Sequence, residues 1–250
     1  MKLYGLGGVG TGKLGSQVFA VKSGVQIVRQ YQPVVAIPNT AAQVETRAKM
    51  KLASQVAAVV SPAIAIAPVG NKTKRNLFIS RNYSNISYED NTASIALSKM
   101  QLTKGTLAFV GLTASKTQAG KISAKLREAA PADITKVAYC VVRQSEEGNL
   151  SYVESKVIDR EANGTFEFVS DAQAYNGNRY SVLAYGIRVN SEKAALKLGM
   201  LAAPTAEDIA KIVATRALSD SDITLTQTVG ATFAAEGGST EPEQGGPVNP

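Results

Sequence analysis

Few residues of this chain have types and spacings that could support catalysis. Residues 7–14 fit the phosphate-binding pattern G-x-x-x-x-G-K, but Leu14 stands where a Ser or Thr would ligate magnesium. Glycine and β-branched residues follow, in place of the helix that such a loop requires. The carboxylate groupings Glu89-Asp90 and Asp159 with Glu161 have no evident acid–base partner in the sequence. The glycine-rich start therefore favours a flexible arm over a nucleotide-binding loop.

The composition excludes most of the common kinds of catalytic and metal site. The 250 residues include no histidine, no tryptophan and one cysteine, Cys140. Without imidazole there is no Ser-His-Asp or Cys-His arrangement and no His-containing zinc site, and one cysteine cannot form an internal disulfide. Cys140 lies in the apolar run of residues 137–142, which predicts a buried core residue. The sequence thus predicts a protein that is not an enzyme, with no catalytic residues, no metal site and no cofactor.

Charge is distributed unevenly along the chain. Residues 1–127 contain 17 Lys+Arg and 3 Asp+Glu, whereas residues 128–250 contain 10 and 17. Such segregation indicates that the first part binds an anionic partner, either nucleic acid or an acidic protein surface. A solvated basic face is the structural alternative for these side chains. The predicted contact residues are Lys13, Lys22, Arg29, Arg47, Lys49, Lys51, Lys72, Lys74 and Arg75.

Two segments precede the β-rich part of the chain. Residues 1–37 are predicted to form an extended, glycine-rich basic arm, because apolar and polar side chains alternate from residue 16 onward. This arm is either an edge hairpin or a segment that pairs with a neighbouring subunit. Residues 38–62 are predicted to form one long helix, because Thr40 and Gln43 have capping-box spacing and apolar residues follow at helical intervals.

The central part of the sequence predicts a mainly β fold. Residues 63–118 form a β-rich segment, and residues 119–201 form an immunoglobulin-like β-sandwich with Asn-Gly pairs in its tight turns. Before residue 130 the expected strands are residues 77–83, 93–97, 106–110 and 122–126. A helix is the alternative for residues 120–130, because Ile122, Leu126 and Ala129 also have helical spacing. The expected strands of the sandwich are residues 137–143, 150–158, 165–169, 180–189 and 195–198.

The last part of the chain predicts a short helix, a strand and a tail. Within residues 202–235, Thr205 and Asp208 form a capping box for a helix that is expected to run to about Leu218. The alternating residues 223–229 are a strand that is either added to the same sandwich or donated to another copy. Residues 236–250 are rich in Gly, Pro and Glu and are expected to be disordered. No segment has the length and polarity of a membrane span or a signal peptide, so we expect no membrane contact.

Across residues 12–200 the chain resembles a domain family found in Bacteroidetes and in phages that infect them. The similar positions are Gly12-Lys13-x-Gly15-Ser16, Arg29, Asn39-Thr40-x-x-Gln43, Arg47, Lys49, Met50, Lys104-Gly105-x-Leu107, Ala132-Asp133, Gly177, Tyr180, Tyr185 and Gly199. Two features depart from the family pattern: the usual aromatic near Leu126 is missing, and the chain continues well past Gly199. The resemblance implies a basic arm and helix followed by an immunoglobulin-like domain in a phage-associated setting. It implies no reaction and no catalytic residues.

These features together predict a non-enzymatic structural protein of a bacteriophage virion, either capsid-associated or a connector or tail component. Such a protein would assemble in the host cytoplasm as a homo-oligomer, with other virion proteins as partners, and the arms and opposite charges would join its copies. The alternative is a protein that binds packaged nucleic acid without sequence preference through its basic half. A surface adhesin or carbohydrate-binding module is a third hypothesis, which the β-sandwich alone supports.

Overall fold

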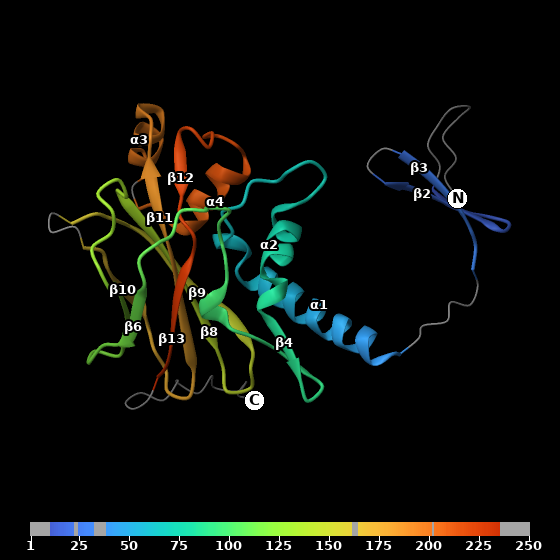
Figure 1. Ribbon diagram of the computed structural model, residues 1–250, viewed down its shortest axis with the longest axis horizontal. Coiled ribbons are helices and arrows are strands. Elements are labelled where there is room, and N and C mark those ends of the chain that lie inside the picture. Colours follow the sequence, from blue (N-terminus) through green and yellow to red (C-terminus); the bar gives the residue numbers. More distant parts are fainter. Residues whose placement is uncertain (1–10, 23–24, 33–38, 162–164, 202, 236–250) are drawn as a thin grey trace, which may run out of the picture. The chain divides into compact units, whose positions relative to one another are not determined.

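The computed structural model describes residues 11–22, 25–32, 39–161, 165–201 and 203–235 (Figure 1). The chain divides into two compact units, residues 1–44 and residues 45–250, and each is described by itself. Three predicted features lie outside the described residues: positions 7–10 of the glycine-rich pattern, the Asn-Gly pair at residues 163–164, and the disordered tail of residues 236–250.

The first unit contains a three-stranded antiparallel sheet. Its strands are β1 (Gly12–Leu14), β2 (Gln17–Lys22) and β3 (Val25–Gln30), in the order β1-β2-β3. Gly15 has a φ of 58°, which is the left-handed backbone that the tight β1–β2 turn requires. The alternation in the sequence correctly predicted extended structure here. The strands pair with one another as a separate sheet and not as an edge of the sheets described below.

The second unit is built around a large antiparallel sheet. Its strands are β8 (Lys136–Gln144), β9 (Leu150–Asp159), β11 (Arg179–Val189), β12 (Ile223–Leu225) and β13 (Val229–Ala234). The order is β12-β11-β8-β9, and β13 also pairs with β11. Val137 and Tyr139 of β8 belong to one apolar cluster, whereas Ala138 and Cys140 belong to another on the opposite face. Burial on both faces explains the continuous apolar sequence of β8, and the prediction that Cys140 is a core residue is confirmed.

A smaller antiparallel sheet covers one face of the large sheet. It contains β6 (Leu112–Lys116), β7 (Lys121–Leu126) and β10 (Glu167–Gln173), in the order β10-β7-β6. Side chains of both sheets form one apolar cluster, in which the rings of Tyr139 and Phe168 stack with their centres 5.2 Å apart. The core of this half of the unit therefore lies between two antiparallel sheets.

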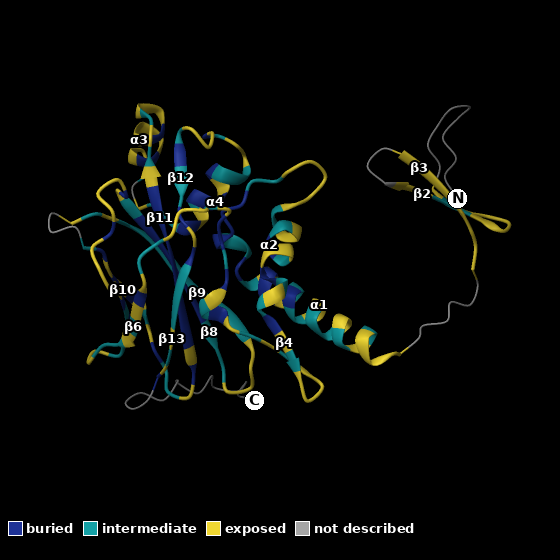
Figure 2. Cartoon of the chain, viewed as in Figure 1, coloured by how far each residue is buried: buried dark blue, intermediate teal, exposed yellow. Residues whose placement is uncertain are grey.

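Helices cover the opposite face of the large sheet. They include α1 (Ala41–Val59), α2 (Lys74–Asn82) and α4 (Ala206–Ala214), whose apolar residues join Ala138 and Cys140 in the second cluster. Helix α3 (Glu192–Gly199) follows β11, and a hairpin of β4 (Ile86–Glu89) and β5 (Thr92–Ile95) follows α2. Figure 2 shows the buried residues concentrated in β8, β11 and the adjoining faces of α1 and α4.

Helices α1 and α4 confirm two predictions, since both start where their caps were expected. The Thr205–Asp208 capping box is formed. Hydrogen bonds from the hydroxyl and the backbone N–H of Thr205 lower the pKa of the Asp208 carboxyl. Helix α4 ends earlier than predicted, at Ala214, and Arg216 beyond it has a φ of 52°. This left-handed residue turns the chain away from the helix axis before Leu218.

Two predicted strands are helices. Residues 77–83 lie mostly in α2, which Thr73 caps by accepting a hydrogen bond from the Asn76 backbone N–H. Residues 195–198 lie in α3, which Ser191 caps in the same way. Each helix buries one pair of residues four apart, Phe78 with Asn82 and Ala194 with Leu198. Both helices are so short that the sequence shows only one such repeat, which a strand pattern can imitate.

Three further strand predictions need correction. Residues 106–110 form no strand, and β6 begins at Leu112 instead. The predicted strand 165–169 is β10, which is displaced to Glu167–Gln173. The predicted strand 223–229 is divided into β12 and β13, and both of them pair with β11 of the same chain. In this chain both strands are therefore added to their own sheet.

Buried threonines hold the divided edge strand in place. The backbone between β12 and β13 carries Thr226 and Thr228, which are 1% and 4% exposed. Thr226 Oγ1 accepts from the Gly186 N–H at 2.8 Å, and Thr228 Oγ1 accepts from the Leu102 N–H at 2.8 Å. Thr103 Oγ1 donates to the Thr226 carbonyl at 2.6 Å. Residues 101–103 are therefore joined to a segment more than 120 positions later in the chain.

The charge boundary in the sequence does not coincide with a boundary in the fold. Strand β7 precedes the cut at residues 127/128 and β10 follows it, yet the two strands pair directly. The division that the structure makes is different: residues 1–44 contain four Lys+Arg and no Asp or Glu, whereas residues 45–250 contain 23 and 20. Positive charge without compensating acids is therefore a property of the small first unit and of the helices that follow it.

Candidate interaction surfaces

The nine predicted contact residues fall into two groups. Lys13, Lys22 and Arg29 are in the sheet of the first unit. The other six lie on α1, in the turn just before α2, or at the start of α2: Arg47, Lys49, Lys51, Lys72, Lys74 and Arg75. Arg81, in the last turn of α2, is a seventh exposed cation that the sequence reasoning missed because residues 77–83 were assigned to a strand. Residues 41–85 contain Glu45 as their one acid.

Several of these cations have structural partners. Lys74 Nζ donates to the Ser61 carbonyl and Arg75 Nη2 to the Ser54 carbonyl, each at 3.0 Å, so both fasten α2 to α1 and the turn after it. Lys49 Nζ lies 2.7 Å from a carboxylate oxygen of Glu45. Its hydrogen bond to Glu45 raises the pKa of the Lys49 ammonium. Lys49 is therefore the least suited of the nine to bind a further anion.

A row of exposed cations runs along the helix pair. Arg47, Lys51 and Ser54 are spaced by four and three residues, which places them on one face of α1. Arg75 binds the Ser54 carbonyl and so adds its guanidinium at the end of that row. We call Arg47, Lys51 and Arg75 the basic strip, and all three residues are exposed. A row of positive groups at helical spacing can neutralise successive charges of a polyanion.

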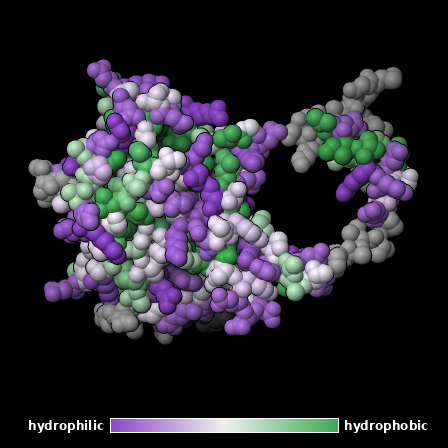
Figure 3. All heavy atoms as spheres, viewed as in Figure 1, coloured by the Kyte–Doolittle hydropathy of each residue, from purple (hydrophilic) through white to green (hydrophobic). Residues whose placement is uncertain are grey.

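The sheet of the first unit has no interior of its own. None of its described residues is buried, and all six residues of β3 are exposed. Apolar side chains are prominent among them: the exposed fractions are 55% for Leu14, 65% for Val25 and 50% for Val28. Figure 2 shows the exposed strands in yellow, and Figure 3 shows hydrophobic side chains gathered on them. Exposed apolar residues concentrated on so small a sheet make it a candidate interaction surface.

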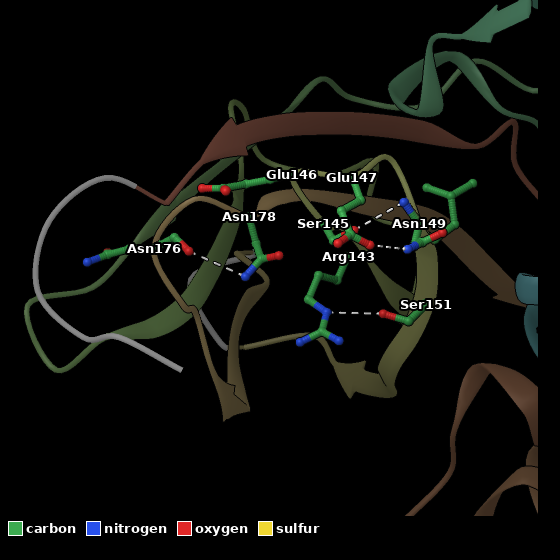
Figure 4. A pocket seen from close by; sticks show the side chains of 9 residues that line it. Arg143, Ser145, Glu146, Glu147, Asn149, Ser151, Asn176 and Asn178 are labelled. Carbon is green, nitrogen blue, oxygen red and sulfur yellow. Dashed lines mark hydrogen bonds between the residues drawn. The ribbon is translucent and has the colours of Figure 1, made fainter. Parts of the chain in front are cut away.

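The second unit has a polar hollow at one end of the large sheet (Figure 4). It has a volume of about 460 Å³ and lies between the β8–β9 turn and the β10–β11 turn. Its polar lining residues are Arg143, Ser145, Glu146, Glu147, Asn149, Ser151, Asn176 and Asn178. Gly177 has a φ of 74°, and a Cβ there would lie 1.9 Å from a carboxylate oxygen of Glu146. The positive φ is what favours glycine here, because the Glu146 carboxylate ends a flexible side chain that can move aside.

The side chains of this hollow bind one another. Arg143 Nε donates to Ser151 Oγ at 3.2 Å, and Asn149 Nδ2 donates to a carboxylate oxygen of Glu147 at 3.0 Å (Figure 4). Among the lining residues, no serine hydroxyl has a base beside it that could accept its proton. A second hollow of about 540 Å³ is mostly apolar, with Lys104, Arg216 and Asp220 at its wall. At the wall of this second hollow, the Ser219 hydroxyl donates to the Asp222 carboxylate at 2.7 Å. Hydrogen bonds from Ser219 lower the pKa of that carboxyl to about 2, which makes it a weak base.

Burial shifts the pKa values of a thiol and of phenol groups in the second unit. Burial raises the pKa of the Cys140 thiol to about 12, so the thiol stays protonated and unreactive at neutral pH. Burial also raises the pKa of Tyr185 strongly and that of Tyr152 to about 12. Among the described residues, the Tyr185 hydroxyl has no hydrogen-bond partner. No group of three acids or thiols that could hold a metal ion occurs in the described part of the chain.

Comparisons with protein-family models, with curated proteins and with solved structures find no match to this chain. In the described residues, no helix combines the length and apolar character needed to cross a membrane. Two surfaces of the described chain are candidates for binding, namely the sheet of residues 12–30 and the basic strip.

Proposed function

We propose that this chain is a non-enzymatic structural protein of a bacteriophage particle that assembles into a symmetric oligomer through its amino-terminal arm. The observation that carries the proposal is the three-stranded sheet of residues 12–30, in which no described residue is buried. A sheet gains stability from an apolar face that is covered, and short strands that are exposed on both faces are marginal in water. A partner that covers these side chains supplies the missing burial.

The fold and the setting are part of the same proposal. Two antiparallel sheets with a shared core support an immunoglobulin-like sandwich. The capsid-associated, connector or tail location is supported by the sequence resemblance to a phage-associated family. Burial keeps the Cys140 thiol and the Tyr185 hydroxyl protonated at neutral pH, which supports a non-catalytic role.

The first prediction is that the purified chain forms oligomers whose mass depends on the arm. Substituting Val21→Lys together with Val25→Lys places two charges on the sheet and should shift the mass toward the monomer, because a buried ammonium opposes association. Size-exclusion chromatography with light scattering measures the mass across protein and salt concentrations.

The matched control for this prediction changes two exposed apolar residues of the other unit. Leu196→Lys with Met200→Lys, at positions 67% and 84% exposed, should leave the mass unchanged. A wild-type chain that stays a monomer under every condition contradicts the proposal.

A second function is favoured by the basic strip: contact with packaged nucleic acid through phosphate charge. Arg47, Lys51 and Arg75 are exposed in a segment with one acid, and aromatic residues make up 6% of the chain. Base stacking is therefore a minor mode, and binding should depend on charge alone.

The second prediction concerns the salt dependence of that binding. Arg47→Gln with Lys51→Gln should weaken binding to duplex DNA of any sequence and should reduce the slope of log K against log salt by about 0.9 per lost phosphate contact. Fluorescence anisotropy with a labelled duplex measures the slope. The control, Lys193→Gln with Lys197→Gln on α3, removes the same charge elsewhere and should change the slope less. A flat titration for the wild type rejects this function.

A further inference from the structure

The two faces of the amino-terminal sheet differ in chemistry. Directly paired residues of an antiparallel sheet point to the same side. Phe19 pairs with Val28, Val21 with Gln26, and Leu14 with Gln17. We call this side the neutral face, and its residues are Gly12, Leu14, Gln17, Phe19, Val21, Gln26, Val28 and Gln30. None of these residues is charged.

The opposite side carries the positive charge. Val18 pairs with Lys13 on one side and with Arg29 on the other, which places both cations in one row across the sheet. Lys13 Nζ lies 3.4 Å from the centre of the Tyr31 ring, a cation–π contact that fixes the ammonium on this side. We call it the cationic face, and it also contains Ile27, which is 43% exposed.

We propose that the neutral face binds the neutral face of a second copy of this chain, so that two arms form a six-stranded sandwich around a two-fold axis. The proposal names the partner of the arm and rests on the assembly function proposed above. A two-fold interface brings identical surfaces together, so each surface must complement itself. The neutral face meets this condition, because it has no charge and because the amides of Gln17, Gln26 and Gln30 both donate and accept hydrogen bonds. The cationic face does not complement itself, because Lys13 and Arg29 would face the same positive residues of the second copy and repel them.

The size of the face sets the expected strength of the contact. Six residues of strand and three strands span about 20 Å by about 15 Å, or about 300 Å² of sheet. This is well below the roughly 800 Å² per partner of a stable interface. The arm contact should therefore be reversible and dependent on concentration by itself, and it should gain strength when a closed assembly holds many copies together.

Cross-linking can tell the two faces apart. Val28 and Ile27 are adjacent on β3, are exposed to similar extents, and lie on opposite faces. The single native cysteine, Cys140, is fully buried, so an introduced cysteine is the accessible thiol of the chain. With a short bis-maleimide reagent, the Val28→Cys variant of the full chain should give at least about tenfold more covalent dimer than Ile27→Cys. Equal yields from both variants, or no dimer from either, overturn the proposal.

A second pair of variants separates this proposal from the assembly function. Val28→Lys should lower the mass measured by light scattering, and Ile27→Lys should not, since an added cation is already compatible with the cationic face. If the wild type assembles but Val28→Lys leaves its mass unchanged, the neutral-face contact is wrong and the assembly function stands. If the wild type is a monomer throughout, both proposals fail.

Discussion

Replacing Gly105 by alanine should lower the free energy of unfolding of the larger unit by about 3 kcal/mol. A Cβ at this position would lie 2.1 Å from the Leu225 carbonyl oxygen and 2.4 Å from that of Thr226. Both atoms belong to backbone that β11 and the buried threonines hold in place, so the contact cannot be relieved by rotating a side chain. The segment that carries Gly105 would have to move away from the edge of β12.

Chemical denaturation of the full chain, followed by circular dichroism, measures this change. Gly199→Ala is the matched control, because a Cβ at that residue would have no atom within 4 Å and because the residue ends α3. That substitution should leave stability unchanged or raise it by up to about 1 kcal/mol. If Gly105→Ala costs no more than Gly199→Ala, the close approach of residues 101–107 to the segment after β12 is wrong.

Phe168→Ala should lower the free energy of unfolding by about 4 kcal/mol. Its side chain is fully buried between the two sheets and stacks on the ring of Tyr139. Alanine would remove that ring contact and leave a cavity that strands on both sides cannot easily fill. The denaturant concentration at the midpoint of unfolding should fall, whereas the dependence of the unfolding free energy on denaturant concentration should stay the same.

The neighbouring residue provides the control for this prediction. Val169 follows Phe168 on β10, points to the opposite side, and is 43% exposed. Val169→Ala should change stability by no more than about 0.5 kcal/mol. Similar losses for the two variants would show that β6, β7 and β10 do not share a core with the large sheet.

The sequence correctly predicted elements that have a long pattern within their own residues, such as β8 and α1. The apolar run at 137–142 indicated β8 because only a strand buried on both faces needs apolar residues at every position. Helix α1 was predicted from its cap and several turns of periodicity, whereas α2 and α3 each show one buried pair and were predicted as strands. The division of residues 223–229 into two strands depends on partners more than 120 positions away, which no local pattern can reveal.

The candidate surfaces were predicted in part. The cations were found from composition, but their grouping into a row on α1 and a row across β1–β3 required the register of the strands and the contact of Arg75 with Ser54. The neutral face was missed, although its signal was present. Lys13 and Arg29 each have a fixed place in the alternation of their strands, and both pair with Val18, which assigns these two cations to one side of the sheet.

The order in which the chain leaves the ribosome gives the divided edge strand a consequence for synthesis. The amino-terminal sheet emerges first, while the edge of β11 stays unpaired until residues 223–234 have been translated. An unpaired edge invites association with any other strand. An open β11 edge on one nascent chain can pair with a strand of another, so slow translation of residues 223–234 would favour pairing between chains over pairing within one chain.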